Sequence, residues 1–185
     1  MPEHVKYAVF GTKWGYFGLA GTHSGLLRTH LPAPEPEKVK SRLLKGLGPA
    51  EYKKTYLMSV QEMITAYFAG TYVNFDSDIA VTLDGLSEFS QRILTACRNV
   101  KYSKTISYGQ LAKKTGQPAA IRAVGAALAK NPLPLIIPCH RVIYSDGRTG
   151  GFSAAGPKRM KEKMLTHEAN KVAAGEPGAV LIRGV

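Results

Sequence analysis

The sequence has only two cysteines, Cys97 and Cys139, among its 185 residues. Two cysteines do not make a disulfide framework, and without a CxxC pair or a third cysteine a zinc–thiolate site is not expected. Long apolar runs are also absent, because the longest, Leu133 to Ile137, is far too short to span a bilayer. The first four residues, Met1-Pro2-Glu3-His4, begin no signal peptide pattern. We therefore expect a cytoplasmic (nucleoid-associated) or nuclear protein that makes no contact with membrane.

Acidic residues are scarce in the second half of the chain. Residues 1–84 contain 9 Lys and Arg against 8 Asp and Glu, whereas residues 85–185 contain 16 against 5. A generally basic soluble protein would also have a positive net charge, but it would not concentrate the excess on one side. This asymmetry predicts that the second half binds a polyanion, with nucleic acid as the first candidate.

The first half has the pattern of a small β-rich domain with helices. Three short apolar or aromatic runs separated by Gly and Thr/Ser predict a β-meander, and a loop with three prolines follows. A helix is then expected, and the capping-box pattern Ser59-x-x-Glu62 predicts another that Gly70 closes. The three runs, the prolines and the first helix are Val5–Phe10, Gly15–Ala20, Leu26–Leu31, Pro32, Pro34, Pro36 and Glu37–Leu47.

The second half is predicted to be mostly helical. Leu86 to Val100 is expected to form a helix with Cys97 on its apolar face, as a buried structural thiol. A capping box at Ser107-x-x-Gln110 opens a short helix that ends at Thr115-Gly116. Pro118 suits the first position of the next helix, Ala119 to Lys130, which Asn131-Pro132 stops. Two short helices joined by a tight turn predict a helix-turn-helix.

The expected fold class is therefore α+β. A small β-rich α/β N-terminal domain, residues 1–80, precedes a mostly helical, winged-helix-like C-terminal domain, residues 85–175. The boundary is placed in the irregular, acidic segment 71–83. Residues 176–185 form a tail whose role the sequence does not define.

The second helix of the predicted helix-turn-helix has an unusual surface. Ile121, Val124 and Leu128 are expected on its core face, and the opposite face offers only Arg122 and three small residues, Gly125, Ala126 and Ala129. A helix that reads base edges in the major groove would carry long polar side chains there. Small residues allow close approach of the backbone to a minor groove or a phosphate wall. The alternative is a helix buried on both sides.

Cys139 lies in the segment Ile137-Pro138-Cys139-His140-Arg141-Val142-Ile143, after an apolar run that we expect to be extended and buried. A thiolate is a strong nucleophile, and a nearby imidazole or cation lowers its pKa. In an extended strand consecutive side chains point to opposite faces, so His140 would reach Cys139 only through a turn or a bridging water. A buried, inert cysteine beside a structural histidine remains the alternative.

Glu168 is predicted in the middle of an apolar stripe on the C-terminal helix, which runs from Lys158 to about Ala173. Met160, Met164 and Val172 share its i, i+4 row. A carboxylate at such a position is either paired in the interior or left at the rim. Pairing with His140 would give a Cys–His–Glu relay, the general form of an activated nucleophile.

These motifs resemble the O6-alkylguanine-DNA alkyltransferases, the methylated-DNA–protein-cysteine methyltransferases. The resemblance covers residues 86–168, and the first 80 residues fit only in general layout. The motifs that carry it, besides the Cys139 segment, are Thr105-Ile106-Ser107-Tyr108-Gly109, Arg122-Ala123-Val124-Gly125, Asn131-Pro132, Gly150-Gly151-Phe152-Ser153 and Glu168.

The resemblance implies direct repair of alkylated DNA without a cofactor. Cys139 would irreversibly accept the alkyl group of O6-alkylguanine after the base is flipped from the minor-groove side, and O4-alkylthymine is a further candidate substrate. His140 would act as its base through a water, Glu168 would hold the imidazole, and Asn131 would fasten the preceding segment. The implied lesion-binding residues are Tyr108, Val142, Phe152 and Ser153. The implied DNA-binding residues are Arg122, which would fill the gap in the base stack, Gly125, Ala126, Ala129, Ser90, Gln117 and Ser145.

Double-stranded DNA carrying the lesion would be the partner, and the protein would act as a monomer with cooperativity on DNA left open. Phe152 and Ala154-Ala155 depart from the family pattern, and the alanine pair is expected to narrow the pocket against large adducts such as benzyl. Some relatives hold zinc through N-terminal cysteines. This chain has none before Cys97, so no metal is expected despite His4, His23 and His30.

Two alternatives to this activity follow from the same residues. A non-catalytic relative that only binds alkyl lesions would lack the reactive cysteine, whereas Cys139 is present. A plain basic DNA-binding module would leave Cys139 inert.

Overall fold

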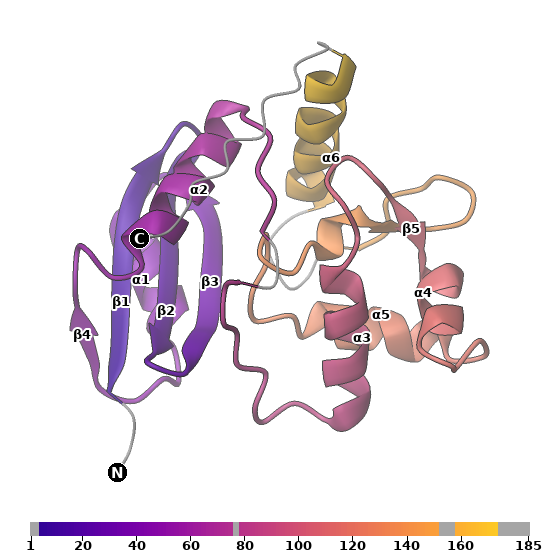
Figure 1. The fold of residues 1–185 in the computed structure, drawn as a ribbon, viewed down its shortest axis with the longest axis horizontal. Coiled ribbons are helices and arrows are strands. Elements are labelled where there is room, and N and C mark those ends of the chain that lie inside the picture. The colour runs from indigo at the N-terminus through magenta and orange to yellow at the C-terminus, as the bar shows by residue number, and fades with distance from the viewer. Residues whose placement is uncertain (1–3, 76–77, 152–157, 174–185) are drawn as a thin grey trace. The chain divides into compact units, whose positions relative to one another are not determined.

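The computed structural model describes residues 4–75, 78–151 and 158–173, and these fall into two compact units divided between Thr82 and Leu83. Figure 1 labels the helices α1–α6 and the strands β1–β5. The sheet and helices together make an α+β fold. No helix in the described ranges is long and apolar enough to cross a membrane.

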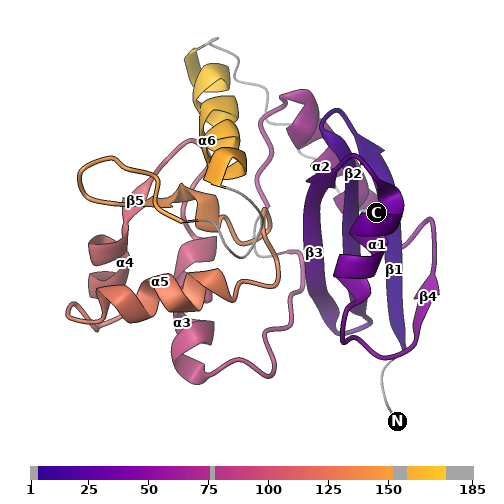
Figure 2. The ribbon, with the colours of Figure 1, turned by 180° about the vertical axis from the view of Figure 1, so that it is seen from behind.

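The described residues of the first unit form a four-stranded sheet between two helices. The sheet has the order β3-β2-β1-β4, with β1 and β4 parallel and the other pairs antiparallel. Helix α1 packs on one face, where its Val39 and Leu43 lie against Gly18, and α2 packs on the other, where Phe68 meets Phe17 (Figure 2). The elements are β1 (Val5–Thr12), β2 (Gly15–Thr22), β3 (Gly25–Ala33), α1 (Pro36–Leu44), β4 (Ala50–Tyr52) and α2 (Met58–Ala69).

The predicted meander is confirmed. The prediction of the proline loop is partly wrong, and so is that of α2, whose end is correct but whose capping box is not. Pro32 lies inside β3, and Pro36 is the first residue of α1, where a proline needs no backbone donor. The predicted box does not form, because Leu57 is the N-cap of α2 and Ser59 lies within the helix. Gly70 closes α2 as predicted, in the left-handed conformation with φ of 99°.

In its described residues, the second unit has four α-helices, one 3₁₀ turn and a two-stranded parallel ribbon. The elements are α3 (Glu88–Arg98), β5 (Ile106–Ser107), α4 (Tyr108–Lys114), α5 (Ile121–Ala129), the 3₁₀ turn η1 (Cys139–Arg141), β6 (Val142–Ile143) and α6 (Lys158–Ala173). Ser107 and Gln110 form the predicted capping box at the start of α4. Cys97 is fully buried in α3, as its place on the apolar stripe predicted.

Helix α5 differs from the prediction at its first turn. It begins at Ile121, and Pro118 belongs to the preceding turn, so Pro118 does not occupy the first helical position. Val124 and Leu128 are buried as expected, but Ile121 is 45% exposed. Arg122 and Ala126 are exposed, which excludes a helix buried on both sides.

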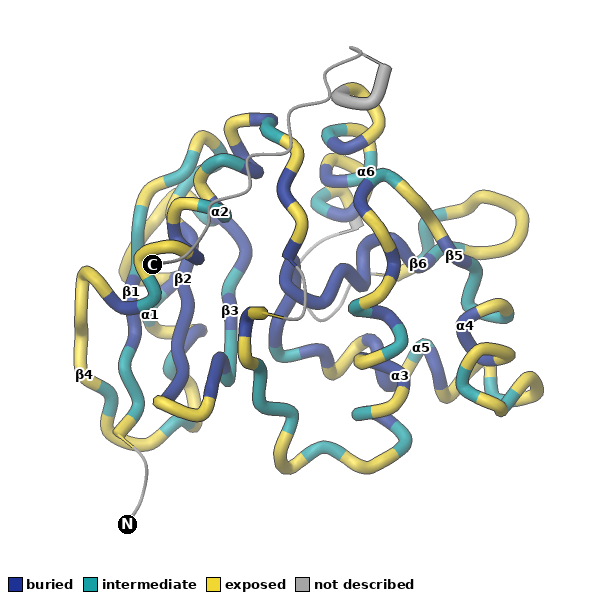
Figure 3. Tube along the Cα trace, viewed as in Figure 1, coloured by how far each residue is buried: buried dark blue, intermediate teal, exposed yellow. Residues whose placement is uncertain are grey.

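The chain from residue 133 to 142 is buried throughout (Figure 3), but it is not an extended strand. Leu135 has a φ of 79°, and Pro134 and Ile137 form an isolated bridge, so the apolar run makes a tight turn. The expectation of extended backbone was wrong because the run doubles back between its two prolines. The same turn delivers Cys139 into η1, where the chain coils before it joins β6.

Candidate active site around Cys139

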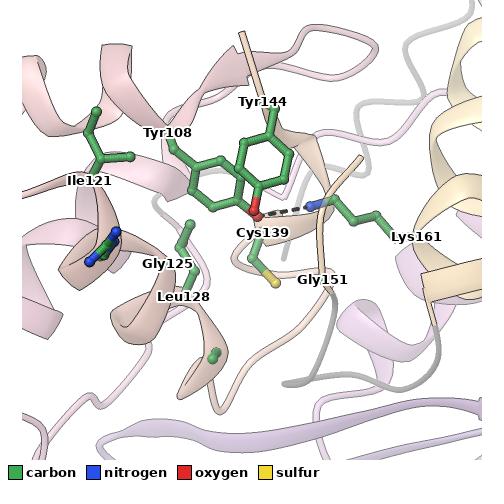
Figure 4. A pocket seen from close by; sticks show the side chains of 10 residues that line it. Tyr108, Ile121, Gly125, Leu128, Cys139, Tyr144, Gly151 and Lys161 are labelled. Carbon is green, nitrogen blue, oxygen red and sulfur yellow. Dashed lines mark hydrogen bonds between the residues drawn. The ribbon is translucent and has the colours of Figure 1, made fainter. Parts of the chain in front are cut away.

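A cavity of about 330 Å³ opens above Cys139 (Figure 4). Its walls come from α4, α5, the segment after β6 and α6, all within the second unit. The residues that line it are Tyr108, Ile121, Arg122, Gly125, Leu128, Ala129, Cys139, Tyr144, Gly151 and Lys161. The volume lies near the lower end of the range for small-molecule sites, about 300–1,000 Å³. Ile121 therefore forms part of a pocket wall instead of the core.

Cys139 is 5% exposed, and its sulfur is held by an amide side chain. Asn131 Nδ2 donates to the Sγ atom at 3.1 Å and to the carbonyl of Ile137 at 2.9 Å, while its Oδ1 accepts from the Leu133 N–H. Burial raises the pKa of the Cys139 thiol, and the Asn131 hydrogen bond and the Lys161 charge oppose that rise. The free thiol thus lies in a site that disfavours the thiolate through burial and stabilises it through hydrogen bonds from Asn131 and the backbone and through the charge of Lys161.

His140 and Glu168 form a buried pair. His140 Nε2 lies 2.8 Å from Glu168 Oε1, and the two side chains are 0% and 1% exposed. Burial of Glu168 excludes the alternative that it lies at the rim. Burial also lowers the pKa of His140, against the opposing influence of Glu168, so the imidazole is neutral at neutral pH. The other ring nitrogen, Nδ1, has no hydrogen-bond partner among the described residues.

Arg141 completes this network, although no pattern in the sequence assigned it a role. Its Nε and Nη2 donate to the Glu168 carboxylate at 2.9–3.3 Å, and its Nη1 donates to the Val100 carbonyl at 2.6 Å. Burial alone would raise the pKa of Glu168, but the hydrogen bonds and charges of His140 and Arg141 outweigh it and hold that pKa well below its usual range. Ser103 N–H also donates to Oε2, so the carboxylate is fixed from several directions.

Lys161 is a second residue of the site that was not predicted from the sequence. It is 1% exposed, and its Nζ donates to the Val142 carbonyl at 2.6 Å and lies 3.5 Å from the Tyr108 hydroxyl. Burial lowers the pKa of Lys161, while Cys139 and Cys97 act in the opposite direction. The helical spacing held a signal, because Lys161 lies three residues before the buried Met164 and seven before Glu168.

Tyr108 lies on the pocket wall, where it was expected to contact the lesion. Burial raises the pKa of its phenol, with further contributions from Tyr144 and Cys139, so the hydroxyl remains a donor. Val142 is fully buried and contributes its backbone carbonyl to Lys161. Tyr144 also lines the cavity, 5.1 Å from Tyr108 between ring centroids, and no motif had drawn attention to it.

The predicted DNA-binding residues divide into three groups. Arg122, Gly125 and Ala129 line the cavity on α5, and Ala126 is exposed on the same helix. Gln117, in the turn before α5, is half-buried, and Ser145, after β6, is exposed.

Ser90 is different, because it is 4% exposed and its hydroxyl accepts from the Ser87 side chain at the start of α3. The Ser90 side chain is therefore turned into the unit, and a contact of this residue with the DNA backbone stays a prediction. Phe152, Ser153 and the Ala154-Ala155 pair lie outside the described residues.

The arrangement suits nucleophilic chemistry on a small group. A thiol lies at the base of a pocket, a neutral imidazole is oriented by a carboxylate, and a phenol and an ammonium group flank the space above the sulfur. In the described part of the chain, no three His, Cys, Asp or Glu side chains are grouped so that they could hold a metal ion.

Known proteins with similar sequences share one activity in their names. The family described as 6-O-methylguanine DNA methyltransferase, DNA binding domain, matches residues 88–170. A methylated-DNA–protein-cysteine methyltransferase of Mycolicibacterium paratuberculosis is 44% identical over 89% of this chain and 92% of its own length. The mouse protein of the same name is 32% identical over 95% of this chain and 85% of its own.

Solved structures give the same result for the fold. The crystal structure of Mycobacterium tuberculosis OGT in complex with DNA superposes with a TM-score of 0.75 at 30% identity, covering 90% of this chain and 94% of that one. An O6-methylguanine-DNA methyltransferase of Pyrococcus kodakaraensis, 21% identical, has the same fold with a TM-score of 0.65 over 89% of this chain and 98% of that one. With the identity and coverage found for the first relative, this chain belongs to the methylated-DNA–protein-cysteine methyltransferase family.

Proposed function

We propose that this protein repairs DNA by transferring the alkyl group of O6-alkylguanine to the Sγ atom of Cys139. The observation that carries the proposal is the free thiol at the base of a small pocket, next in sequence to a buried His140–Glu168 pair. Membership of the family supports the reaction type. O4-alkylthymine, whose alkyl group is also bonded to an exocyclic oxygen, is a second candidate substrate.

Activation of the thiol begins with proton transfer. The Cys139 proton passes through a bridging water to Nδ1 of His140, and Glu168 stabilises the imidazolium through Nε2. The network around Glu168 keeps that carboxylate ionised, so that it can stabilise the imidazolium that forms while His140 carries the proton. Asn131 holds the sulfur in place and partly offsets the cost of a buried thiolate.

Transfer is then a single displacement. The thiolate forms a bond to the alkyl carbon as the bond between that carbon and O6 breaks, and the electron pair stays with guanine. Tyr108 donates a hydrogen bond to the purine, and Lys161 stabilises the charge that develops there. The thioether product has no easy leaving group, so Cys139 is not regenerated. The protein therefore acts once and needs no cofactor.

The DNA-binding surface is proposed on α4, the turn 115–120 and α5, as a helix-turn-helix in a winged-helix-like domain. Cys139 is buried, so a lesion base must leave the duplex to reach it. The small exposed side chains of α5 allow close approach in the minor groove, and Arg122 fills the gap left by the flipped base.

Phosphate contacts supply most of the affinity, since lesions occur in any sequence context and the charge excess lies in residues 85–185. The proposed domains are residues 1–80 and 85–175, followed by the tail 176–185. The protein acts as a monomer in the cytoplasm on the nucleoid, or in the nucleus.

The competing function is a relative that binds alkyl lesions without chemistry. Cys139 and the His140–Glu168 pair argue against it, because a pure binding protein needs neither. Incubation with duplex DNA carrying O6-methylguanine, followed by intact and peptide masses, separates the two. One added methyl on the peptide containing Cys139 supports transfer. Tight lesion binding without a mass change would instead establish the binding protein, and no preference for the lesion would leave a plain DNA-binding module.

A further inference from the structure

Tyr144 and Tyr108 are brought together by the register of the short parallel ribbon. Ser107 in β5 pairs with Ile143 in β6, so the next residues of both strands emerge side by side at the same end. Their ring centroids lie 5.1 Å apart with planes at 46° (Figure 4). Backbone pairing therefore fixes where Tyr144 stands relative to Tyr108, which lies on the lesion-binding wall.

Two further contacts hold the Tyr144 ring in place. Arg148 lies over it, with the guanidinium carbon 5.2 Å from the ring centroid, and Asp146 Oδ2 accepts from Arg148 Nε at 2.7 Å. Gly150 lies close to both tyrosines, and a Cβ there would lie 3.0 Å from both the Tyr108 hydroxyl and the Tyr144 ring. The tight turn between Tyr144 and Arg148, closed by a 2.8 Å backbone hydrogen bond, places both residues.

The braced ring limits the cavity above the thiol. Tyr144 and Tyr108 lie together on one side of a space of about 330 Å³, and Ile121, Gly125 and Leu128 of α5 also line it. Cys139 is 5% exposed, so an alkyl group must enter this space to reach the sulfur. Tyr144 itself is 44% exposed, which places it at the mouth and not in the core.

We propose that Tyr144 determines the size of alkyl group that reaches Cys139, with Arg148 and Gly150 fixing its ring against Tyr108. The proposal rests on the alkyl-transfer function above and names a specificity-determining residue for it. A methyl adduct fits beside the ring, whereas a benzyl adduct must displace it and break the stack with Arg148.

The test compares two duplexes of one sequence, carrying O6-methylguanine or O6-benzylguanine, and follows addition to Cys139 by mass against time. The measured quantity is the benzyl-to-methyl ratio of rate constants, and comparison between variants cancels the intrinsic reactivity of the two adducts. We expect Tyr144→Ala to raise this ratio by at least about tenfold, the scale of a changed apolar contact in a binding pocket. Tyr144→Leu, which keeps part of the bulk, should raise it less.

Three matched variants sharpen the outcome. Tyr144→Phe keeps the ring and its contact with Arg148. It should leave the ratio within about threefold of the unmodified protein, a change no larger than the effect of one cation–π contact. Arg148→Ala removes the guanidinium and should give an intermediate rise. Tyr52→Ala, at a half-exposed tyrosine of the first unit that does not line the pocket, should leave the ratio unchanged.

The failures of the two proposals are distinguishable. If the unmodified protein accepts methyl, and the benzyl-to-methyl ratio in Tyr144→Ala and in Tyr144→Leu equals that of the unmodified protein, the size limit lies elsewhere. This inference is then wrong while the function stands. If the unmodified protein accepts no alkyl group from either duplex, the function fails and the inference fails with it.

Discussion

The two units bury different kinds of side chain. In the first, the buried polar residues are the uncharged Thr22, Thr29 and Gln61, and the interior is aromatic and aliphatic. In the second, His140, Arg141, Lys161 and Glu168 are buried along with the apolar core, and they account for every buried ionisable His, Lys, Arg or Glu in the described residues. Buried charges are a poor source of stability but a good source of fixed electrostatic fields. The interior of the first unit is thus built for packing alone, whereas that of the second unit also holds charged groups that can act on a reacting molecule.

The two cysteines give the largest expected contrast. Both thiols are buried and free, but only Cys139 lines the cavity, while burial in α3 raises the pKa of Cys97 well above its ordinary value. Cys139→Ser should abolish alkyl transfer, because the hydroxyl is too weak a nucleophile. Cys97→Ala should still accept one alkyl group per molecule. Peptide masses after incubation with lesion DNA check both, and a Cys139→Ser protein that became alkylated would overturn the assignment.

Glu168→Gln should affect both chemistry and stability. It keeps the shape but leaves Arg141 buried without a counter-charge, which costs about 3–5 kcal/mol when one partner of a buried pair is lost. Alkyl transfer should slow by about 10²-fold or more, because the imidazole loses the carboxylate that holds it for proton transfer. Mass spectra of samples quenched at a series of times give the rate of alkyl transfer, and urea unfolding gives the change in the free energy of unfolding.

The matched control is Glu162→Gln, an exposed residue of the same helix α6. Its effect on unfolding should stay within about 0.5 kcal/mol, as for most surface substitutions. Equal effects of the two substitutions would contradict a special role for the buried carboxylate.

Phe68→Ala tests the first unit by the same measure. Phe68 is fully buried, with Trp14 and Phe17 among the rings around it, so truncation should cost about 3–5 kcal/mol. Trp14 is the only tryptophan, so its fluorescence reports unfolding of this unit. Thiol labelling of Cys97 in a Cys139→Ser background reports the second unit. The pH dependence of alkyl transfer should not change in Phe68→Ala, and a changed profile would tie the first unit to the chemistry.

The smallest expected effect is a pH dependence of the stability of the second unit. Burial lowers the pKa of His140, so the unfolded chain binds the proton more readily, and the free energy of unfolding should fall as pH drops below about 6.5. The pKa of Glu168 is also lowered, so its contribution is present above about 4.5 and is lost as pH falls further.

Cys97 labelling in the Cys139→Ser protein should therefore show progressive loss of stability on acidification. In Glu168→Gln the loss of stability below pH about 4.5 should be smaller, since one of the groups that titrate there is gone. The range from pH 7 to pH 4 spans the ordinary pKa values of His and Glu, about 6.5 and 4.3. Protection of Cys97 from labelling that stays constant over this range would show that the buried network does not titrate.

Much of the fold follows from local patterns in the sequence. The strands of the meander, the capping box at Ser107 and the course of α6 were predictable because each depends on neighbouring residues. The errors fall where distant residues decide the backbone. Ser59 could cap α2 by sequence, but the helix begins after Leu57 in left-handed conformation, and the run before Cys139 turns instead of extending.

The site was only partly predictable for the same reason. Cys139, His140 and Glu168 were identifiable from a motif and from a carboxylate in an apolar stripe, while their roles stay predictions. Arg141 and Lys161 were overlooked because Arg and Lys usually lie at the surface, and only the tertiary structure reveals what they bond to.

The sequence by itself determined that this chain has a reactive-cysteine motif, a basic second half and an unusually bare helix, because composition and spacing are properties of the chain alone. The tertiary structure decided which groups meet. Only folding brings Glu168, 28 residues from His140, within 2.8 Å of it, and only the β5–β6 pairing sets Tyr144 beside Tyr108. Contacts between residues far apart in sequence depend on packing of the whole unit, and so no local pattern could have specified them.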